Sequence, residues 1–520
     1  MHLRPGGRKL FLHSICVLAV GLAYLLTLTA GHAIAQDDFA GYIMHAANLV
    51  EGRPYTAIHY IANPTALWLA PANGYPPVYP LLLAPAYKVW GINFRAFKAV
   101  TIFCFVVFLA IFSTLTGKHF PTSIGVATML LLACNPVPWE LHDYLLSEFP
   151  YLMFTFASLL VAEHVYADLK AQEFRIGSAF LLSLLLYASY GTRTIGIALL
   201  PGLVLVDLLK FRRPSRFLLV VLALTAALIL GQTVLLTAPK GYLMALELSA
   251  HTVVRNALFY SKTLSYVWAN GFNKMAQIVF ALLFTALAVA GFVRRLWAER
   301  SLREFYLPGY LAILFVWPAQ LGLRGLLPIL PLYFAYGLAE FQGILATLAP
   351  RARAIAAALL LLFVGATYAG ELRKWSQEPP QANVNDKAPQ ELFAFLRTHT
   401  GPSEVFLFIN PRALALYTNR SVGTLAPAES PEDSSQFVKS VNATVLVEPV
   451  SSPPEWEALL VSNKIRAFEI FHNSQYSVFR IALNEGRQPS LPVASPAVFP
   501  NESAMAFNRP CLYFYHTGCR

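Results

Sequence analysis

Long apolar segments recur along this chain of 520 residues. A helix that crosses a bilayer needs roughly 20 mostly apolar residues, and eleven segments come close to that length. They are residues 11–30, 97–116, 121–137, 148–167, 176–192, 194–210, 217–236, 275–293, 305–320, 324–345 and 352–371. Charged residues make up 13% of the chain, against about 25% in soluble globular proteins. The sequence therefore predicts a polytopic α-helical membrane protein and excludes a water-soluble enzyme.

The short basic loops predict the orientation of these helices, because Lys and Arg are retained on the cytoplasmic side. Residues 4–9 carry three basic side chains, and residues 210–216 and 294–303 form two further basic loops. Residues 138–147 contain neither Lys nor Arg. We therefore expect a plasma (inner) membrane protein with a cytoplasmic N-terminus and with 138–147 outside. The net charge of +11 then reflects loops that face anionic lipids, and no nucleic-acid partner is expected.

One more apolar segment, residues 78–90, is shorter than a span and contains two prolines. If it crossed the membrane, residues 138–147 would lie inside and the basic residues 210–216 outside. We therefore expect an interfacial or re-entrant helix within a large first external loop, residues 31–95. The alternative is that 78–90 spans the membrane and that another short segment does not.

The two ends of the chain leave further alternatives open. Residues 11–30, followed by Ala33-Ile34-Ala35, resemble a cleavable secretory signal. The apolar part of such a signal has about 7–15 residues, so we expect a retained helix instead. Cys511 and Cys519 could form a disulfide if the C-terminus lies outside the cytoplasm.

The composition changes after Glu371, where Pro, Ser, Glu and Asn become frequent. We expect a transmembrane module of residues 1–371, a linker of residues 372–388, a small α/β domain of residues 389–483 and an irregular tail of residues 484–520. The strands of this domain are predicted at 404–409 and 443–447, and a hairpin at 468–483 turns near 473–475. An odd number of spans places the domain outside the cytoplasm.

Acidic residues occur at two points of the predicted outer membrane face. Asp37 and Asp38 precede a helical pattern that ends at Gly52-Arg53-Pro54, and Glu148 begins the fourth apolar segment after Glu140, His142 and Asp143. A carboxylate here suits a general base for an acceptor hydroxyl or a ligand of a divalent cation. A charge at the membrane boundary is costly unless it is paired, hydrated or functional. The alternative is that Asp37 or Asp38, and Ser147 before Glu148, only cap helices.

Basic residues that depart from the cytoplasmic pattern fall on the same face. Arg193 lies between the fifth and sixth segments and Arg324 at the external end of the tenth. The loop 237–274 adds His251, Arg255 and Lys262 among aromatic residues. Arginine can hold a phosphate through two parallel hydrogen bonds, so these cations suit a lipid-linked phosphate. They could equally be residues that extend to the membrane surface.

Several of these residues form a pattern that resembles a known family. Asp38, Tyr42, Ala46, Leu49, Gly52 and Pro54, followed by Gly74-Tyr75-Pro76-Pro77-Val78-Tyr79-Pro80, resemble the first external loop of the GT-C membrane glycosyltransferases. The similarity is to the protein O-mannosyltransferase and aminoarabinose-transferase-like group. Residues 147–151 (SEFPY) and 324–331 (RGLLPILP) are similar to further segments of that group.

This resemblance implies transfer of a sugar, usually with inversion, from a polyprenyl-phosphate carrier to a lipid, glycan or protein acceptor. Asp38 is the implied base, and the carboxylates of Asp37 and Glu148 would favour the developing positive charge on the sugar. The implied phosphate-binding residues are Arg324, Arg193, Arg255 and Lys262. The implied donor and acceptor contacts are Tyr42, Arg53, Tyr75 and His251. Some relatives have Lys where this chain has Tyr75. The one cofactor that could be expected is a divalent cation held by Asp38 and Glu148.

Two other classes of function remain open from the sequence. A lipid-linked-sugar transporter or flippase predicts polar groups through the depth of the membrane, and the spans contain few. A non-catalytic membrane subunit would bind a partner through the C-terminal domain and would tolerate loss of Asp38 and Glu148.

Overall fold

The computed structural model describes residues 5–65, 72, 74–169, 175–236, 248–269, 273–377, 381–425, 430–450, 459 and 465–483, with side chains from residue 13 onward. The tail predicted at 484–520, with Cys511 and Cys519, lies outside the described residues. The described chain forms two compact units. A helical unit takes residues 5–57 and 72–383, and a sheet unit takes residues 58–65 and 384–483.

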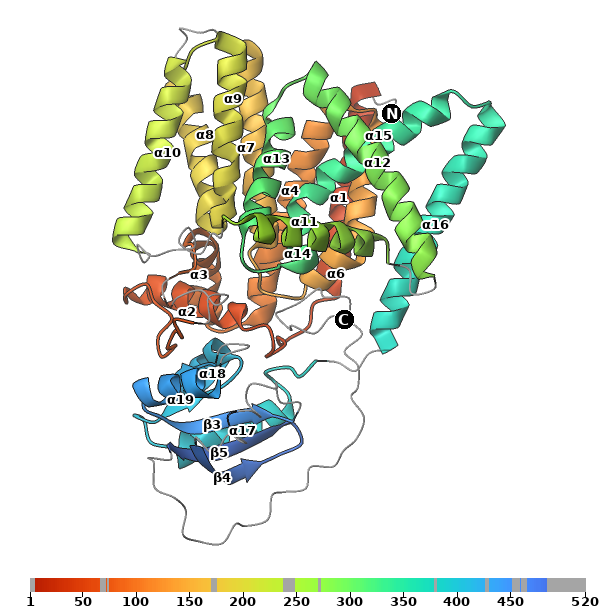
Figure 1. Ribbon diagram of the computed structural model, residues 1–520. Helices are drawn as coiled ribbons and strands as arrows, with labels where there is room; N and C mark the ends of the chain where they lie inside the picture. Colours follow the sequence, from red (N-terminus) through yellow and green to blue (C-terminus); the bar gives the residue numbers. More distant parts are fainter. Residues whose placement is uncertain are drawn as a thin grey trace. The chain divides into compact units, whose positions relative to one another are not determined.

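The helical unit consists of helices of very different lengths (Figure 1). The first half contains α1 (Pro5–Leu26), α2 (Asp38–Glu51), α3 (Val78–Trp90), α4 (Phe94–His119), α5 (Thr122–Cys134), α6 (Pro136–Leu141), α7 (Glu148–Asp168), α8 (Ile176–Thr192), η1 (Thr194–Ala198) and α9 (Leu199–Phe211). The second half contains α10 (Arg216–Leu235), α11 (Ala250–Ser265), η3 (Tyr266–Trp268), α12 (Lys274–Ala298), α13 (Leu302–Val316), α14 (Gly322–Leu326), η4 (Leu327–Ile329), α15 (Leu330–Ala346) and α16 (Pro350–Gln377).

The protein is a multi-pass membrane protein. Six helical stretches of the described chain are long and apolar enough to cross a membrane: Phe94–His119, Thr194–Phe211, Arg216–Leu235, Lys274–Ala298, Gly322–Ala346 and Pro350–Gln377. Three shorter apolar helices accompany them: His13–Leu26, Thr122–Cys134 and Ile176–Thr192. Each of the eleven predicted segments overlaps a helix, although 121–137, 194–210 and 324–345 are each divided between two or three helical elements. The number of crossings stays a prediction. The predicted linker is partly helical, because α16 continues to Gln377 and α17 begins at Lys387.

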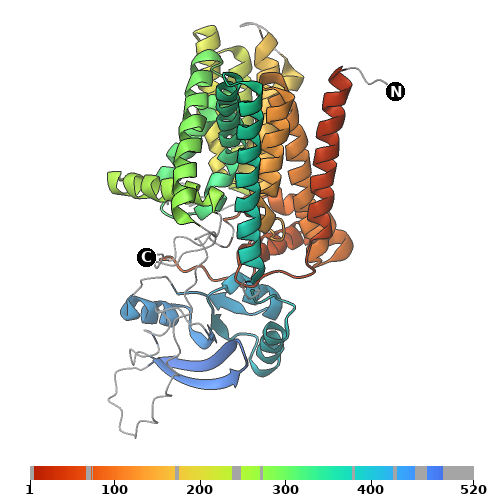
Figure 2. The ribbon, with the colours of Figure 1, turned by 90° about the vertical axis from the view of Figure 1, so that its right-hand side faces the viewer.

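The long helices run side by side, whereas α2 and α11 lie across them near one end of the bundle (Figures 1 and 2). The bundle is held together by aromatic packing. Along α4, Phe97, Phe105, Phe108 and Phe112 recur at helical spacing and are fully buried. The ring of Phe105 stacks on Phe149 of α7, with 4.3 Å between centroids. Close contacts of this kind drive helix association in lipid, where burying apolar surface brings no gain over the lipid itself.

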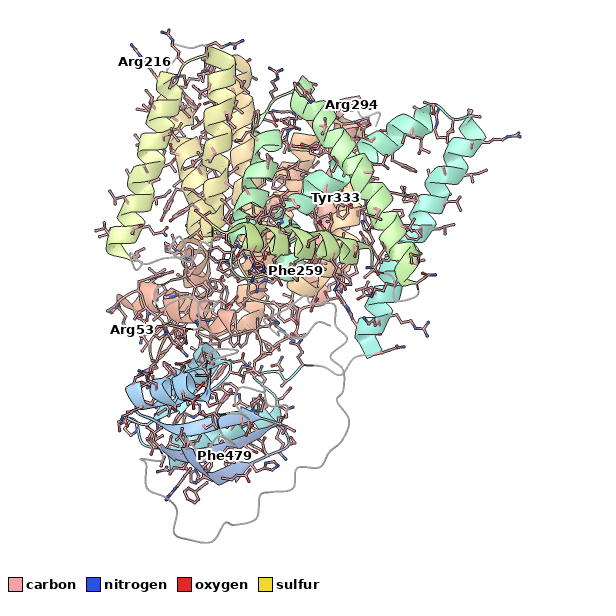
Figure 3. All side chains as sticks on the ribbon, viewed as in Figure 1. Arg53, Arg216, Phe259, Arg294, Tyr333 and Phe479 are labelled. Carbon is pink, nitrogen blue, oxygen red and sulfur yellow. The ribbon has the colours of Figure 1, made fainter. Side chains whose placement is uncertain are left out.

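The two basic loops reach the same end of the bundle. Arg216 and Arg294 lie at that end, and Arg53 lies toward the other, where α2 crosses (Figure 3). α3, the segment predicted to be interfacial, has 13 residues and packs beside α2. Its length is about 20 Å at 1.5 Å per residue, which is less than a hydrocarbon core of about 30 Å.

The sheet unit contains five strands in the order β2-β1-β3-β5-β4. They are β1 (Val405–Leu407), β2 (Ser421–Gly423), β3 (Ala443–Pro449), β4 (Ile465–His472) and β5 (Tyr476–Leu483), with helices α17 (Lys387–His399), α18 (Pro411–Thr418) and α19 (Pro431–Ser440). β1 pairs in parallel with β2 and β3, and β5 pairs antiparallel with β3 and β4. The predicted α/β character and the hairpin turn after His472 are confirmed.

A short segment of residues 31–95 belongs to the sheet unit, which the sequence did not predict. Tyr60 forms a bridge with Val422, and the side chain of Asn63 donates to the carbonyl of Thr424 at 3.1 Å. The guanidinium of Arg412, which is fully buried, lies 4.6 Å from the ring centroid of Tyr60. Residues 58–65 therefore extend the sheet unit beside β2.

Candidate active site

The first turn of α2 begins at Asp38, which is tied to a tyrosine of the Pro-Pro segment. The phenol of Tyr75 donates to Asp38 Oδ1 at 2.6 Å, and the phenol of Tyr55 donates to the carbonyl of Tyr75 at 3.0 Å. Gly52 ends α2 as predicted, with a left-handed φ of 65° that only glycine adopts without cost. The backbone of α2 and the side chain of Tyr75 thus fix the position of Asp38, and Tyr55 in turn holds the backbone of Tyr75.

Two arginines converge on one carboxylate oxygen of Glu148, the first residue of α7. Arg324 Nε lies 2.7 Å and Arg193 Nη1 2.5 Å from Glu148 Oε1. The other side of the Arg324 guanidinium reaches Asp38, with 3.5 Å between Nη2 and Oδ2. Arg324 therefore joins the two carboxylates that the sequence singled out. We call Asp38, Glu148, Arg193 and Arg324 the charged cluster.

The chain places Arg193 and Arg324 at breaks between helices. Arg193 separates α8 from η1, and α14 is a single short turn that contains Arg324. Tyr260 of α11 accepts a hydrogen bond from the backbone of Leu321 at 3.0 Å, and Tyr310 of α13 donates to the carbonyl of Gly325 at 2.8 Å. These tyrosines satisfy the irregular backbone on both sides of Arg324, as a helix break within a membrane protein requires.

Successive hydrogen bonds connect the segment before Asp38 with the segment before Glu148. Thr29 donates through its backbone and its hydroxyl to Asp143, at 2.9 and 2.7 Å. The backbone of Leu145 donates to His32 Nε2 at 3.0 Å. Tyr42 donates to Ser147 Oγ at 3.1 Å. Hydrogen bonds therefore link residues 29–42 to residues 143–147, and the last of them lies next to Glu148 of the charged cluster.

Lys98 of α4 anchors this connection, and sequence analysis missed it. Its side chain is completely buried, and its ammonium group donates to Asp143 at 2.7 Å, to the hydroxyl of Thr29 at 2.8 Å and to the carbonyl of Gly31 at 2.6 Å. A lysine inside an apolar segment is rare unless it has a specific partner. The presence of Lys98 in the apolar segment 97–116 was therefore the sequence feature that could have indicated a buried ion pair.

Two side chains of the connecting segments stay uncharged. Burial lowers the pKa of His32 to about 3, so the ring is neutral and Nε2 can accept the hydrogen bond from Leu145. Burial, followed by the charges of Asp38 and Glu148, raises the pKa of the Tyr42 phenol. Tyr42 therefore remains a hydrogen-bond donor, which is the role it has toward Ser147.

The members of the charged cluster differ in their access to a substrate. The exposed fraction of the side chain is 20% for Asp38 and 17% for Arg193, but 10% for Arg324 and 2% for Glu148. Asp38 and Arg193, and to a smaller extent Arg324, can thus contact a bound molecule directly. Glu148 is placed to hold the two guanidinium groups, because it is buried beneath them.

Other residues that the sequence singled out lie outside the charged cluster. On α11, His251, Arg255 and Lys262 are exposed, and Arg255 donates to the carbonyl of Pro318 at 3.2 Å. Arg53 pairs with Glu51 at 2.6 Å in an exposed position. Tyr260 lies on the opposite, buried face of α11 and contacts the segment that carries Arg324.

Neither Asp37 nor Ser147 caps a helix through its side chain, in contrast to the alternative that the sequence left open. Asp37 occupies the N-cap position of α2 and is buried, but its side chain makes no capping hydrogen bond. Ser147 occupies the N-cap position of α7, and its hydroxyl accepts from Tyr42 instead of capping the helix.

The donor set of the charged cluster does not fit a divalent metal shared by Asp38 and Glu148. The guanidinium of Arg324 occupies the space between these carboxylates, and Arg193 contacts the same oxygen of Glu148. In the described part of the chain, no three His, Cys, Asp or Glu side chains gather as they would around a metal ion.

Several solved membrane-protein structures share this architecture. ArnT from Cupriavidus metallidurans, bound to undecaprenyl phosphate, matches with a TM-score of 0.52 and 13% identity over 91% of this chain and 99% of that chain. The oligosaccharyltransferase of Archaeoglobus fulgidus in complex with Zn and sulfate matches with a TM-score of 0.57 and 11% identity, over 91% of this chain and 73% of that chain. The archaeal oligosaccharyltransferase AglB in complex with an inhibitory peptide and a dolichol-phosphate, also from A. fulgidus, gives a TM-score of 0.54 at 12% identity, over 93% of this chain and 74% of that chain.

The sequence itself matches no family model and no curated protein. The similarity therefore lies in the fold, at identities of 11–13%. The matching structures are GT-C glycosyltransferases, as the motifs of residues 38–55 and 74–80 predicted. This chain has the fold of the GT-C membrane glycosyltransferases.

Proposed function

We propose that this protein transfers a sugar from a polyprenyl-phosphate donor to a hydroxyl group of a lipid, glycan or protein acceptor, with inversion, on the extracytoplasmic face of the plasma membrane. The observation that carries the proposal is the charged cluster, in which a partly exposed carboxylate and two arginines meet. The GT-C fold supports it, since ArnT and AglB structures were determined with undecaprenyl phosphate and dolichol-phosphate.

Asp38 is the proposed base. The acceptor oxygen attacks the anomeric carbon, its proton passes to Asp38, and the bond between that carbon and the phosphate oxygen breaks with the electron pair leaving on the phosphate. Tyr75 donates to one oxygen of Asp38 and Arg324 approaches the other. The exposed fraction of the Asp38 side chain is 20%, so an acceptor hydroxyl can approach the carboxylate.

Arg193 and Arg324 are the proposed ligands of the leaving phosphate. A polyprenyl phosphate leaves as an anion, so it needs neighbouring positive charge more than a general acid. Guanidinium groups bind phosphate oxygens through charge-assisted hydrogen bonds. We propose that Glu148 acts through these two residues, as a positioning group that keeps both cations in place at 2.5 and 2.7 Å.

The ends of the bundle support the orientation that the basic loops predict. Arg216 and Arg294 gather at one end and α2, which carries Asp38, crosses the other (Figures 1 and 3). With the basic end in the cytoplasm, the charged cluster faces the extracytoplasmic side.

The test is sugar transfer by the purified protein from a panel of polyprenyl-phosphate sugars, comparing wild type with Asp38→Asn. We expect transfer by wild type and a loss of at least about 100-fold in the variant, within the usual contribution of a general base of about 10²–10⁴. Glu51→Gln is the matched control, because Glu51 is an exposed carboxylate at the other end of the same helix. Carrier binding is measured in parallel.

Equal transfer by wild type and Asp38→Asn would remove Asp38 from the mechanism. Carrier binding without transfer from any donor would favour a lipid-linked-sugar transporter. Transfer that persists in excess EDTA is expected, since the charged cluster does not provide a shared metal site.

A further inference from the structure

A second polar site lies at the opposite end of α7 from Glu148. A pocket of about 620 Å³ is lined by residues at the ends of α4, α7 and α9 and by the connection from α12 to α13. Tyr166, in its wall, follows Glu148 by 18 residues on α7, which corresponds to about 27 Å along a helix. The pocket is therefore nearly a membrane thickness away from the charged cluster.

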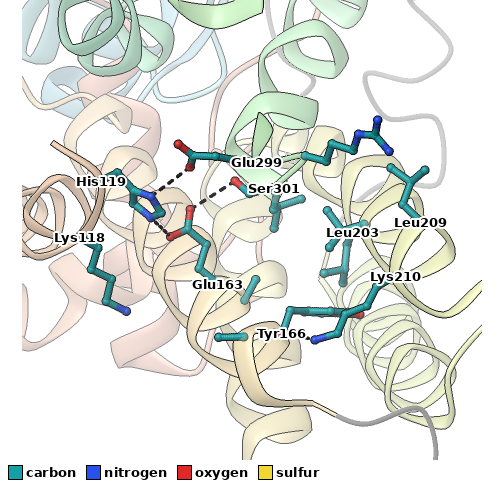
Figure 4. Close-up of a pocket in the computed structure, with 14 residues that line it drawn as sticks. Lys118, His119, Glu163, Tyr166, Leu203, Leu209, Lys210, Glu299 and Ser301 are labelled. Carbon is teal, nitrogen blue, oxygen red and sulfur yellow. Dashed lines mark hydrogen bonds and ion pairs between the residues drawn. The ribbon is translucent and has the colours of Figure 1, made fainter. Parts of the chain in front are cut away.

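The acidic side chains of this pocket already have cationic partners. Glu163 lies 2.6 Å from Arg303 Nε and 2.9 Å from His119 Nε2. Glu299 lies 3.0 Å from His119 Nδ1 and 2.6 Å from Arg295 Nη1. Figure 4 shows Glu163, His119, Glu299 and Ser301 joined on one side of the pocket. These contacts leave little negative charge for a ligand to meet.

Three further cations line the pocket without a carboxylate partner in the described part of the chain. Lys118 and Arg300 are exposed, and the ammonium group of Lys210 donates to the backbone carbonyl of Tyr166. Lys118 and Lys210 stand on opposite sides of the opening (Figure 4). The pocket therefore carries an excess of positive charge that a single anion could bridge.

The remaining wall is apolar. Leu203 and Leu209 of α9 lie on the side of Lys210 (Figure 4), and Leu302 of α13 also lines the pocket. Cations at the ends of spanning helices next to an apolar wall match the two parts of a phospholipid, and basic pockets between such helices bind acidic headgroups. A free inorganic anion would make no use of the apolar wall.

We propose that this pocket binds the phosphate headgroup of an anionic phospholipid, with Lys118, Lys210 and Arg300 as donors and an acyl chain against the leucines of α9. The lipid comes from the leaflet at the basic end of the bundle. The site is separate from the sugar-transfer chemistry, so the proposal stands whether or not the protein is a glycosyltransferase.

The test measures phosphatidylglycerol binding to the purified protein by native mass spectrometry. The pocket variant is Lys118→Gln with Arg300→Asn, because Arg300 has a φ of 49° and Asn tolerates a left-handed backbone. The control variant is Arg351→Gln with Arg212→Asn. Arg212 is also exposed, with a φ of 62°, and neither control residue lines the pocket. Thermal unfolding verifies that both variants are folded.

We expect phosphatidylglycerol to bind wild type and the control equally and the pocket variant about 25-fold more weakly, at about fivefold for each interfacial cation removed. Lys118→Glu alone should also weaken binding. Equal affinity of the two double variants would overturn the proposal. So would equal binding of phosphatidylcholine, or displacement of the lipid by equimolar inorganic phosphate, which would assign the pocket to a soluble anion.

Discussion

The phenol of Tyr75 donates a hydrogen bond of 2.6 Å to Asp38, although the two residues are 37 positions apart in the sequence. Asp38 begins α2, and Tyr75 stands just before the Pro-Pro pair that leads into α3. Tyr75 is a neutral donor and contacts Asp38 without adding charge, so Arg193 and Arg324 supply the positive charge of the charged cluster.

Replacing Tyr75 by Phe should lower kcat while leaving the donor KM nearly unchanged. A hydrogen bond to a charged group contributes about 1.5–3 kcal/mol, which corresponds to a loss of about 10- to 100-fold in rate. Tyr87→Phe is the matched control, because Tyr87 donates to Glu51 at 2.9 Å in an exposed place. A kcat for Tyr75→Phe equal to that of the control would show that Tyr75 does not position Asp38.

Replacing Glu148 by Ala should destabilise the protein strongly. Removing one partner of a buried ion pair costs about 3–5 kcal/mol, because the other charge stays buried without compensation. Here two guanidinium groups would lose their common acceptor. Glu51→Ala, which breaks an exposed pair with Arg53, should cost less than about 1 kcal/mol. Thermal or denaturant unfolding in detergent measures both, and similar costs would contradict the positioning role of Glu148.

Replacing Arg324 by Lys should weaken binding of the polyprenyl-phosphate donor. Lysine offers a point charge and cannot contact Glu148 and Asp38 together as the planar guanidinium does. We expect a loss of at least about tenfold in donor affinity, the range in which a charge-assisted hydrogen bond contributes. Arg255→Lys on the exposed face of α11 should change the affinity less than about twofold. A larger loss of donor affinity in Arg255→Lys than in Arg324→Lys would instead indicate that α11 binds the phosphate.

The neutral state of His32 predicts a pH dependence of stability. Burial lowers its pKa to about 3, whereas an unfolded histidine titrates near about 6.5. Below about 6.5 the unfolded chain gains a proton that the folded chain does not, so the free energy of unfolding falls as the pH is lowered toward 3. His32→Gln keeps an acceptor for Leu145 and should flatten this dependence over that range. His164→Gln, an exposed change on α7, should leave it as in wild type. Parallel curves for wild type and His32→Gln would contradict a neutral buried ring.

The proposed orientation predicts which side of the membrane each loop faces. In a chain without its native cysteines, Glu51→Cys should react with an impermeant thiol reagent added from outside. Arg213→Cys should react only after the membrane is made permeable. Both positions are exposed, so access to the residue itself does not limit the reaction. Labelling of Arg213→Cys from outside, with protection of Glu51→Cys, would invert the orientation.

The sequence located the two carboxylates and the two arginines but not the way they are connected. Asp38, Glu148, Arg193 and Arg324 each stood out because a charge next to an apolar segment is costly and needs a reason. Arg255 and Lys262 met the same criterion, and yet the structure places them on the outer face of α11. The buried face of α11 carries polar residues such as Thr252 and Asn256, whereas Val254 and Leu258 are exposed, so hydrophobicity did not indicate which face turns inward.

The joining of Thr29, His32 and Lys98 to the segment before Glu148 could not be predicted from one sequence. These contacts span 45 to 114 positions, and each is an ordinary hydrogen bond of 2.7–3.0 Å. Such pairs depend on which helices become neighbours, and apolar segments of similar composition do not specify their neighbours. The segment of residues 58–65 that joins the sheet unit is a further case, because its polar residues resemble any loop.

The sequence by itself determined the class of protein. Segments of about 20 apolar residues can satisfy their backbone in lipid only as helices, and the distribution of Lys and Arg predicts which ends face the cytoplasm. The hydrophobic pattern also predicted the hairpin after His472. Tertiary structure alone decided that Arg324 lies between Asp38 and Glu148, 286 and 176 positions away. The physical reason is that local patterns report the surroundings of each segment, whereas a charged site is stabilised by partners that only packing brings within hydrogen-bond distance.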